Sequence, residues 1–266
     1  MRKTRSLRQR LSDQSVAISL ILAFVCLWEA VCRLGLVSPL VLPAPSAVAR
    51  EFFYVCREIA AGGPLRNDLI VTFYETLVGF LLAVVVAFAC GTLIAEVPVL
   101  RRVMMPYLVA VNAAPKIAFA PLLVVWFGFG AGSKVVMAAL IAFFPVLVNT
   151  VAGLASADPA KLRLMRSLAA SAWMTFIKVK LPDSLPVIFA GLKTGIVFAV
   201  VGAVVGEFVG ADAGLGHVIK QTDYQLDVAL TFAIIVLLSL VGILLFYAIE
   251  WLERRALFWA PSHYST

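Results

Sequence analysis

Residues 228–249 read VALTFAIIVLLSLVGILLFYAI and contain no charged side chain. An α-helix needs about 20 predominantly apolar residues to cross the hydrocarbon layer of a bilayer. Residues 77–95 and 135–157 form two further uncharged stretches. Stretches of this kind predict that the chain crosses a membrane as several helices.

The overall composition agrees with a membrane protein. Of the 266 residues, 62% are hydrophobic and 14% are charged, whereas a soluble domain averages about 45–50% apolar and about 25% charged residues. The net charge of +7 does not indicate nucleic-acid binding, because the basic residues concentrate in segments 1–15 and 158–183. Basic segments between apolar spans are typical of the cytoplasmic side of a membrane protein.

The pattern of apolar stretches predicts six membrane spans. They cover residues 16–36, 69–95, 103–127, 135–157, 184–205 and 228–251. With the N-terminus in the cytoplasm, the cytoplasmic segments 1–15, 96–102, 158–183 and 252–266 hold 14 Lys and Arg residues, and the external segments hold 5. The positive-inside rule therefore predicts both termini in the cytoplasm.

The segments around the first span differ from the rest of the chain. The basic start and the apolar stretch after it resemble a signal peptide, but no small-x-small cleavage site follows, so residues 16–36 are expected to stay as an anchor. Glu29 and Arg33 can pair on one helix face. Residues 37–68 form an external segment with a short surface helix at about 47–60. The remaining five spans, residues 69–251, form the core between the two cytoplasmic tails, 1–15 and 252–266.

The loop 158–183 contains two short amphipathic segments. Asp158 is a plausible N-cap with Pro159 at the first helical position, and a second short helix from about Trp173 is expected to end at Pro182. Two short helices cannot bury their apolar faces alone. The residues leave two alternatives open: the loop lies on the membrane surface, or it docks another protein.

Three charged residues in the spans are candidates for the translocation pathway. A charge inside the bilayer costs about 2.5–3.5 kcal/mol even on insertion scales. Lys116 follows Pro115 and either faces a pathway or pairs with Glu75 or Glu207. Glu75 has Thr72 and Thr76 nearby on its helix, and hydrogen bonds from these neighbours are a second way to satisfy its carboxylate.

Glu207 lies within a glycine repeat, Gly202, Gly206, Gly210 and Gly214. This spacing is typical of close helix packing. Glu207 itself can cap a helix, pair with Lys116 or belong to an external gate.

Other motifs are absent from the sequence. No GxxxxGK[ST] occurs, and Gly128, Gly130 and Gly132 before Ser133 and Lys134 are expected to form an external turn. The four cysteines form no CxxC pair, and the two histidines show no ligand spacing, so no metal site is expected. Any ATP would have to be handled by another chain.

The loop resembles the EAA loop of ABC importer permeases, whose pattern is EAA-x3-G-x9-I-x-LP. The corresponding positions, in order, are Arg163, Leu164, Met165, Ala169, Val179, Leu181 and Pro182. The spacing is kept, while Arg163 replaces the acidic residue and Ala169 replaces the glycine. The resemblance implies that residues 164–171, which also include Leu168, Ala170 and Ser171, touch the ATPase.

The resemblance to the nitrate/sulfonate/taurine branch extends over residues 42–252. It is carried by LPAPSAV (42–48), TLVGF (76–80), PLLVVWFGFG (121–130), FFPVLVNT (143–150), VGEF (205–208) and GLG (214–216). The stretch LMRSL (164–168), with Lys116 and the two residues before it, is similar to permeases proposed for riboflavin or thiamine-pyrimidine precursors.

This resemblance implies an all-α, six-span type I importer permease (MetI-like) fold in the prokaryotic plasma (inner) membrane. It implies a homodimer, two separate ABC ATPase subunits that handle ATP and Mg²⁺, an extracytoplasmic substrate-binding protein and alternating access. The chain itself would bind no cofactor and catalyse nothing. The substrate would be a nitrate-, sulfonate- or taurine-like anion, or a vitamin precursor such as riboflavin or hydroxymethylpyrimidine. The alternative is an ion-coupled secondary transporter, which would not need ATP.

Overall fold

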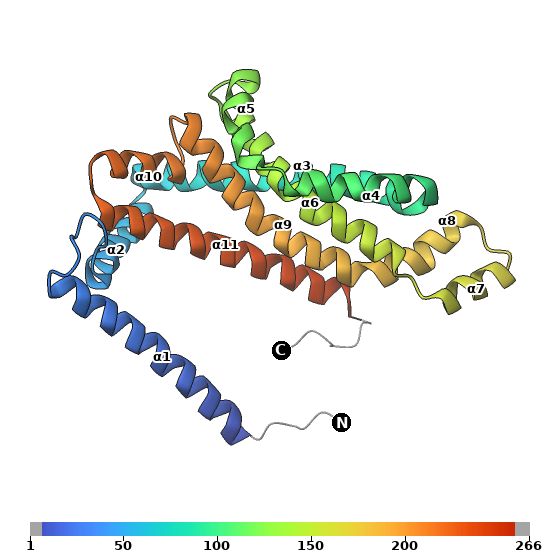
Figure 1. Cartoon of the computed structure of the whole chain (residues 1–266), viewed down its shortest axis with the longest axis horizontal. Coiled ribbons are helices and arrows are strands. Elements are labelled where there is room, and N and C mark those ends of the chain that lie inside the picture. Colours follow the sequence, from blue (N-terminus) through green and yellow to red (C-terminus); the bar gives the residue numbers. More distant parts are fainter. Residues whose placement is uncertain (1–6, 259–266) are drawn as a thin grey trace. The chain divides into compact units, whose positions relative to one another are not determined.

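The computed structural model describes residues 7–258, and this part is helical almost throughout (Figure 1). The longer helices are α1 (Leu7–Arg33), α2 (Pro45–Ala61), α3 (Pro64–Glu96), α4 (Pro98–Ala113), α6 (Ala131–Ala155), α9 (Leu181–Gly210) and α11 (Val228–Ala256). The shorter elements are a 3-10 turn η1 (Lys116–Phe119), α5 (Ala120–Phe127), α7 (Pro159–Ser167), α8 (Ala172–Thr175), a π-helical turn η2 (Phe176–Lys180) and α10 (Leu215–Tyr224). No strand occurs between residues 7 and 258.

The chain divides into two compact units. The first comprises the residues up to Pro64 together with Val218–Leu237. The second comprises Leu65–His217 together with the residues from Leu238 onward, and it therefore holds most of the predicted five-helix core.

Within the first unit, α1 is joined to the start of α2. Arg33 Nε donates a hydrogen bond to Glu29 Oε1 at 2.6 Å, which confirms the predicted pair one helical turn apart. The same carboxylate accepts bonds from the backbone N and the Oγ of Ser46, at 3.0 and 2.7 Å. Glu29 therefore satisfies the orphan donors at the beginning of α2, where Pro45 supplies none.

Four helices are long and apolar enough to cross a membrane: Pro64–Glu96, Ala131–Ala155, Ala172–Gly210 and Val228–Ala256. A fifth span is formed if Pro98–Ala113 and Lys116–Phe127 act together, and these two pieces meet at an angle of 77°. The break falls within the predicted span 103–127. Pro115 explains the break, because it offers no N–H to continue the ladder and disfavours helical geometry at the residue before it. Residues 16–33 of the predicted first span lie in α1 and residues 34–36 lie in the turn after it, and their insertion in the membrane stays a prediction.

The helices α6 and α9 form the most extensive contact of the second unit and lie side by side in Figure 1. Small residues permit this approach. A Cβ on Gly202 would lie 2.6 Å from the Cα of Ala138, and a Cβ on Gly206 would lie 3.0 Å from the Cα of Lys134. The glycine repeat thus serves close packing at these two positions, as the four-residue spacing predicts.

The packing of α3 and α4 on α6 completes this part of the core. Its buried residues are Ala87, Ile94, Val146, Leu147 and Val151. Met104, Met105 and Leu108 from α4 pack against them. The part of α4 before the break is thereby held against α6 through flexible methionine side chains, which fill irregular gaps.

Pro182 does not end a helix, contrary to the expectation from the sequence. Residues Ala172–Gly210 form one continuous helical stretch of 39 residues, in which Phe176–Lys180 is π-helical. The π turn changes the hydrogen-bond register just before Pro182, where a regular helix would require the N–H that proline lacks. The loop is therefore connected to the core without a break.

Candidate functional site

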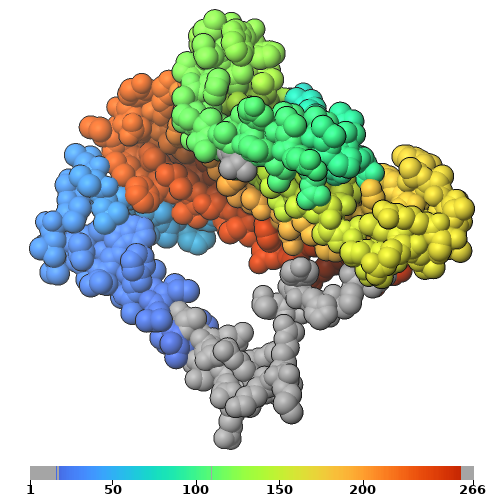
Figure 2. Space-filling model, turned by 45° about the vertical axis from the view of Figure 1, so that its right-hand side comes forward, coloured from blue at the N-terminus to red at the C-terminus, as the bar shows by residue number. Residues whose placement is uncertain are grey.

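The loop 158–183 forms a protruding lobe at one end of the second unit, drawn in yellow in Figure 2. Asp158 Oδ1 accepts a hydrogen bond from the backbone N of Ala160 at 2.8 Å, and Pro159 begins α7. This confirms the predicted N-cap and first position. Ser171 caps α8 in the same way by accepting a bond from the backbone N of Met174 at 3.2 Å.

Ala169 occupies a left-handed backbone conformation, with φ of 52°. Its backbone N donates to the carbonyl of Arg166 at 3.0 Å, and the N of Ala170 donates to the carbonyl of Met165 at 3.0 Å. These bonds close the end of α7. Glycine adopts this conformation without steric cost. The structure therefore gives the physical reason for a glycine at this position of the loop pattern, and alanine carries strain there.

The predicted contact residues divide into an exposed and an inward set. Exposed residues are Arg163, Leu164, Leu168, Ala169 and Ser171. Residues that are half-buried or buried are Met165, Ala170, Val179, Leu181 and Pro182. The exposed residues are available to a partner protein, and the half-buried or buried residues pack against the rest of the chain.

Trp173 is a further exposed residue that the sequence comparison left out of the predicted contact set. Its side chain is 69% exposed and stacks on Phe176 with ring centroids 5.9 Å apart. Leu164 and Leu168 are 58% and 67% exposed. Large apolar side chains on a protruding segment indicate a protein or membrane contact. Trp173 falls between the fixed positions of the loop pattern, so the spacing could not single it out.

One ion pair forms within the loop, and a second joins the loop to α3. Lys161 Nζ lies 2.6 Å from Asp183 Oδ1, and this hydrogen bond raises the pKa of Lys161. Lys180 Nζ donates to both carboxylate oxygens of Glu96 at 2.8 Å. The second pair places the turn after α3 at the same end of the unit as the loop.

Lys116 lies at the break between α4 and α5. Its Nζ donates to the backbone carbonyl and to Oδ1 of Asn112, at 2.8 and 2.9 Å. The same ammonium sits over the ring of Phe144 from α6, 4.7 Å from the ring centroid, which is a cation–π contact. An ion pair between Lys116 and Glu75 or Glu207, the alternative reading of this residue, is not formed.

Glu207 is fully buried near the C-terminal end of α9 and connects this helix to α3 and α10. One of its oxygens accepts from Thr72 Oγ1 at 2.7 Å and the other from the backbone N of Gly216 at 2.5 Å. Thr72 Oγ1 in turn accepts from the backbone N of Leu215 at 2.8 Å. Glu207 thus acts as the cap of α10, one of the roles that the sequence left open.

Gly214 is required beside this carboxylate for two reasons. Its φ is 112°, and a Cβ added to it would lie 2.4 Å from the Cδ of Glu207. Its backbone N donates to Asp68 Oδ1 at 2.8 Å. The fourth glycine of the repeat therefore makes room for a buried carboxylate and does not serve packing between α6 and α9.

Glu75 is also buried, but its helix neighbours do not satisfy it. Its carboxyl lies near that of Glu207. Its Oε2 and the hydroxyl of Thr76 have no hydrogen-bond partner among residues 7–258. The expectation that the adjacent threonines would satisfy Glu75 is wrong, because Thr72 bonds to Glu207.

Lys134 is the cation that lies near these carboxylates. The sequence placed it in an external turn, but it belongs to the first turn of α6 and is 1% exposed. Its Nζ donates to the carbonyl oxygens of Phe129, Gly130 and Gly210. The uncharged stretch 135–157 is the sequence feature that indicates this position, because it begins directly after Lys134 and puts this lysine at the edge of the hydrocarbon layer.

The cluster formed by Thr72, Glu75, Lys134 and Glu207 is called the outer clasp below. Among the described residues, no three His, Cys, Asp or Glu side chains converge on a possible metal position, and all four cysteines are free. The outer clasp joins α3 to α9 through the Thr72–Glu207 hydrogen bond and α6 to α9 through the bond from Lys134 to the carbonyl of Gly210.

Comparison with known proteins agrees with these features. The family model described as "Binding-protein-dependent transport system inner membrane component" matches residues 76–257. The chain is 35% identical to the riboflavin transport system permease protein RibX of Chloroflexus aurantiacus, over 93% of this chain and 90% of that protein. It is also 35% identical to the formylaminopyrimidine transport permease protein ThiX of Halalkalibacterium halodurans, over 90% of this chain and 93% of that protein.

A solved structure shows the same fold. An inward-facing conformation of the MetNI methionine ABC transporter superposes with a TM-score of 0.64 at 20% sequence identity. The match covers 72% of this chain and 95% of the other chain. The predicted importer-permease fold is thereby confirmed.

Proposed function

Because the chain belongs to the family of binding-protein-dependent transport system inner membrane components, we propose that it is the transmembrane subunit of an ATP-driven importer for a small nutrient. Members of this family are multi-pass transport subunits of the inner membrane and not enzymes. The observation that carries the proposal is the loop 158–183, which keeps the spacing of the coupling pattern and holds Ala169 in the conformation that favours glycine.

The partners that we propose are based on the exposed residues of the loop and on the lack of a nucleotide-binding motif in the sequence. Separate ABC ATPase subunits would bind the exposed set Arg163, Leu164, Leu168, Ala169 and Ser171, extended by Trp173. They would carry ATP and Mg²⁺, and this chain would bind no cofactor. An extracytoplasmic binding protein would deliver the substrate, and a second copy of the chain would complete the pathway. The loop and both termini would lie in the cytoplasm, as the positive-inside rule predicts.

Arg163 stands where the coupling pattern has an acidic residue, so the charge of the matching ATPase surface would have to differ. Arg163 is exposed on α7, and Arg166 is exposed on the same helix. A partner surface with acidic groups would complement these guanidinium groups. The apolar side chains of Leu164, Leu168 and Trp173 would supply the buried centre of the contact.

For the substrate we favour a vitamin or vitamin precursor of the riboflavin or pyrimidine type over a nitrate-, sulfonate- or taurine-like anion. The two relatives at 35% identity are named for riboflavin and formylaminopyrimidine transport. Lys116 is the proposed pathway residue, because its ammonium lies at the break in the span beside the amide of Asn112 and the ring of Phe144. For Glu75 and Glu207, the other two pathway candidates, the proposed role is to hold helices together in the outer clasp.

The proposal is tested by reconstituting the chain with its ATPase and binding protein in proteoliposomes. Uptake should require ATP hydrolysis and should stop with a non-hydrolysable analogue. Uptake that proceeds without nucleotide and follows an ion gradient would instead establish a secondary transporter, and the proposal would be overturned.

Replacing Lys116 with methionine should lower the apparent affinity of the importer for its substrate about tenfold or more, because a hydrogen bond to a charged group contributes about 1.5–3 kcal/mol. The measurement is the substrate dependence of ATP-driven uptake in the same proteoliposomes. Arg66→Met, which removes an exposed cation from α3, is the control and should leave uptake unchanged. Wild-type rate and affinity in the Lys116 variant would exclude a contact with the substrate.

A further inference from the structure

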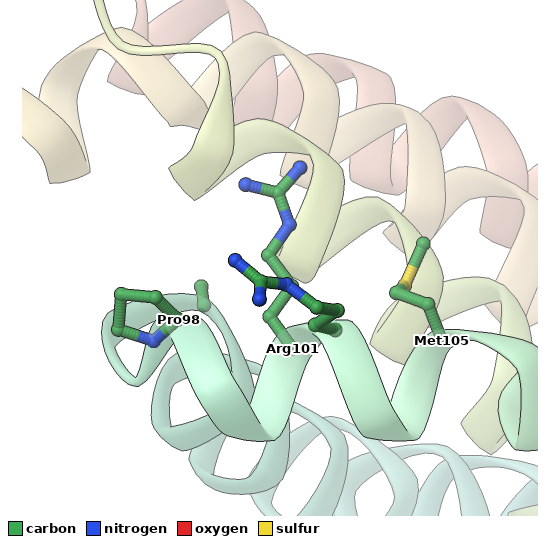
Figure 3. A pocket seen from close by; sticks show the side chains of 5 residues that line it. Pro98, Arg101 and Met105 are labelled. Carbon is green, nitrogen blue, oxygen red and sulfur yellow. The ribbon is translucent and has the colours of Figure 1, made fainter.

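A cavity of about 320 Å³ opens where α3 ends and α4 begins. It is lined by Ala95, Pro98, Arg101, Arg102 and Met105, and this set is called the arginine pocket. Figure 3 shows Arg101 and Met105 projecting from the same side of α4, with Pro98 at its first turn. The pocket thus combines two guanidinium groups with an apolar wall.

Neither guanidinium is neutralised by the described part of the chain. Within residues 7–258, no carboxylate or carbonyl forms an ion pair or a side-chain hydrogen bond with Arg101 or Arg102. The nearest acidic residue along the chain, Glu96, has both oxygens occupied by Lys180 at 2.8 Å. The arginine pocket therefore has a net positive charge that favours an anion.

The surface next to the pocket is apolar and exposed. Val99, Val103 and Tyr107 lie four residues apart along α4 and are 70%, 52% and 62% exposed. Arg102 adjoins both surfaces, because it is three residues after Val99 and three before Met105. The charged pocket therefore continues into an apolar strip along α4, the first part of the bent fifth candidate span.

We propose that the arginine pocket binds the headgroup phosphate of an anionic phospholipid of the cytoplasmic leaflet, with the acyl chains along Val99, Val103 and Tyr107. The side of the membrane rests on the proposed function, because the Lys180–Glu96 pair puts this turn at the same end as the loop that would bind the ATPase. A basic pocket between spans on the cytoplasmic side suits a lipid phosphate. A soluble anion would make no use of the apolar strip.

The test is lipid binding to the purified full-length permease in detergent, followed by native mass spectrometry. The probes are dioleoylphosphatidylglycerol and dioleoylphosphatidylcholine. The wild type should retain the anionic lipid in preference to the zwitterionic one. The double variant Arg101→Gln, Arg102→Gln should bind the anionic lipid about tenfold more weakly or worse, since each basic residue near an anionic surface contributes about 1 kcal/mol.

Two further variants make the result specific. Arg50→Gln, Arg57→Gln removes the same charge from exposed positions on α2 and should leave the lipid preference unchanged. Arg101→Lys, Arg102→Lys keeps the charge and should keep most of the binding, which separates lost binding from lost folding. Equal binding by the wild type and the glutamine variant would overturn the proposal.

Two other outcomes would also overturn it. If inorganic phosphate binds the wild type and displaces the lipid at equal concentration, the pocket is a site for a soluble anion. If the glutamine variant loses affinity for the ATPase but not for the lipid, the arginines bind an acidic protein surface. The lipid measurement uses the permease alone, without ATPase or binding protein. A negative result there would contradict the lipid site, whereas only the uptake measurement tests the importer function.

Discussion

Replacing Glu207 with alanine is expected to lower the free energy of unfolding of the permease by about 2–4 kcal/mol, since each buried donor left unpaired costs about 1–3 kcal/mol. The substitution removes the acceptor of the Thr72 hydroxyl and of the Gly216 backbone N–H, both in a part of the protein that water does not reach. The loop before α10 should then become the first site of cleavage in limited proteolysis. The measurement is the thermal unfolding midpoint of the detergent-purified protein.

Two variants show whether this effect belongs to the outer clasp. Glu207→Gln keeps an acceptor oxygen and should lose about 1 kcal/mol or less, as one hydrogen bond is kept or replaced. Asp223→Ala removes an exposed carboxylate from α10 and should leave the midpoint unchanged. If Glu207→Ala unfolds at the wild-type temperature, the carboxylate does not hold these helices together.

Replacing Ala169 with aspartate should separate ATP hydrolysis from transport. Ala169 is exposed, and aspartate tolerates its left-handed conformation better than most residues. The added charge would face the ATPase, and an unpaired charge at that contact costs at least about 1–3 kcal/mol, so uptake should fall about tenfold or more. Uptake and ATP hydrolysis are measured together in proteoliposomes, and hydrolysis should continue while uptake is lost.

The matched control is Ala169→Asn, which has the same size and backbone tolerance without the charge. It should keep a large part of the uptake. Ala169→Gly relieves the backbone strain and should raise the unfolding midpoint slightly without reducing uptake. Normal coupling in the aspartate variant would show that this part of the loop does not touch the ATPase.

Local patterns in the sequence predicted the local structure well. The long apolar stretches became α3, α6 and α11, and the predicted pair Glu29–Arg33 is formed. Asp158 caps its helix as expected. Each of these features depends on residues within a few positions of one another, where hydropathy, capping and helical spacing are sufficient.

Contacts between distant parts of the chain were not predicted. The partner of Thr72 is Glu207, 135 residues later, and Lys134 bonds to the carbonyl of Gly210. No spacing rule relates such positions, since the packing of α3, α6 and α9 decides which polar groups meet. The sequence also failed to predict that the helix continues past Pro182. The expectation that proline ends a helix assumes regular α-helical hydrogen bonds, and the π turn Phe176–Lys180 changes that register.

In the proposed importer, the uninterrupted helical stretch Ala172–Gly210 would connect the two faces of the membrane. Its 39 residues span roughly 58 Å at about 1.5 Å per residue. Trp173 lies at one end of this stretch, and Glu207 lies at the other. A tilt of about 5° imposed at the Trp173 end would move the Glu207 end by about 5 Å, given that length. If the proposed ATPase tilts the Trp173 end of this helix, a small movement there would therefore become a larger movement at the opposite face of the membrane.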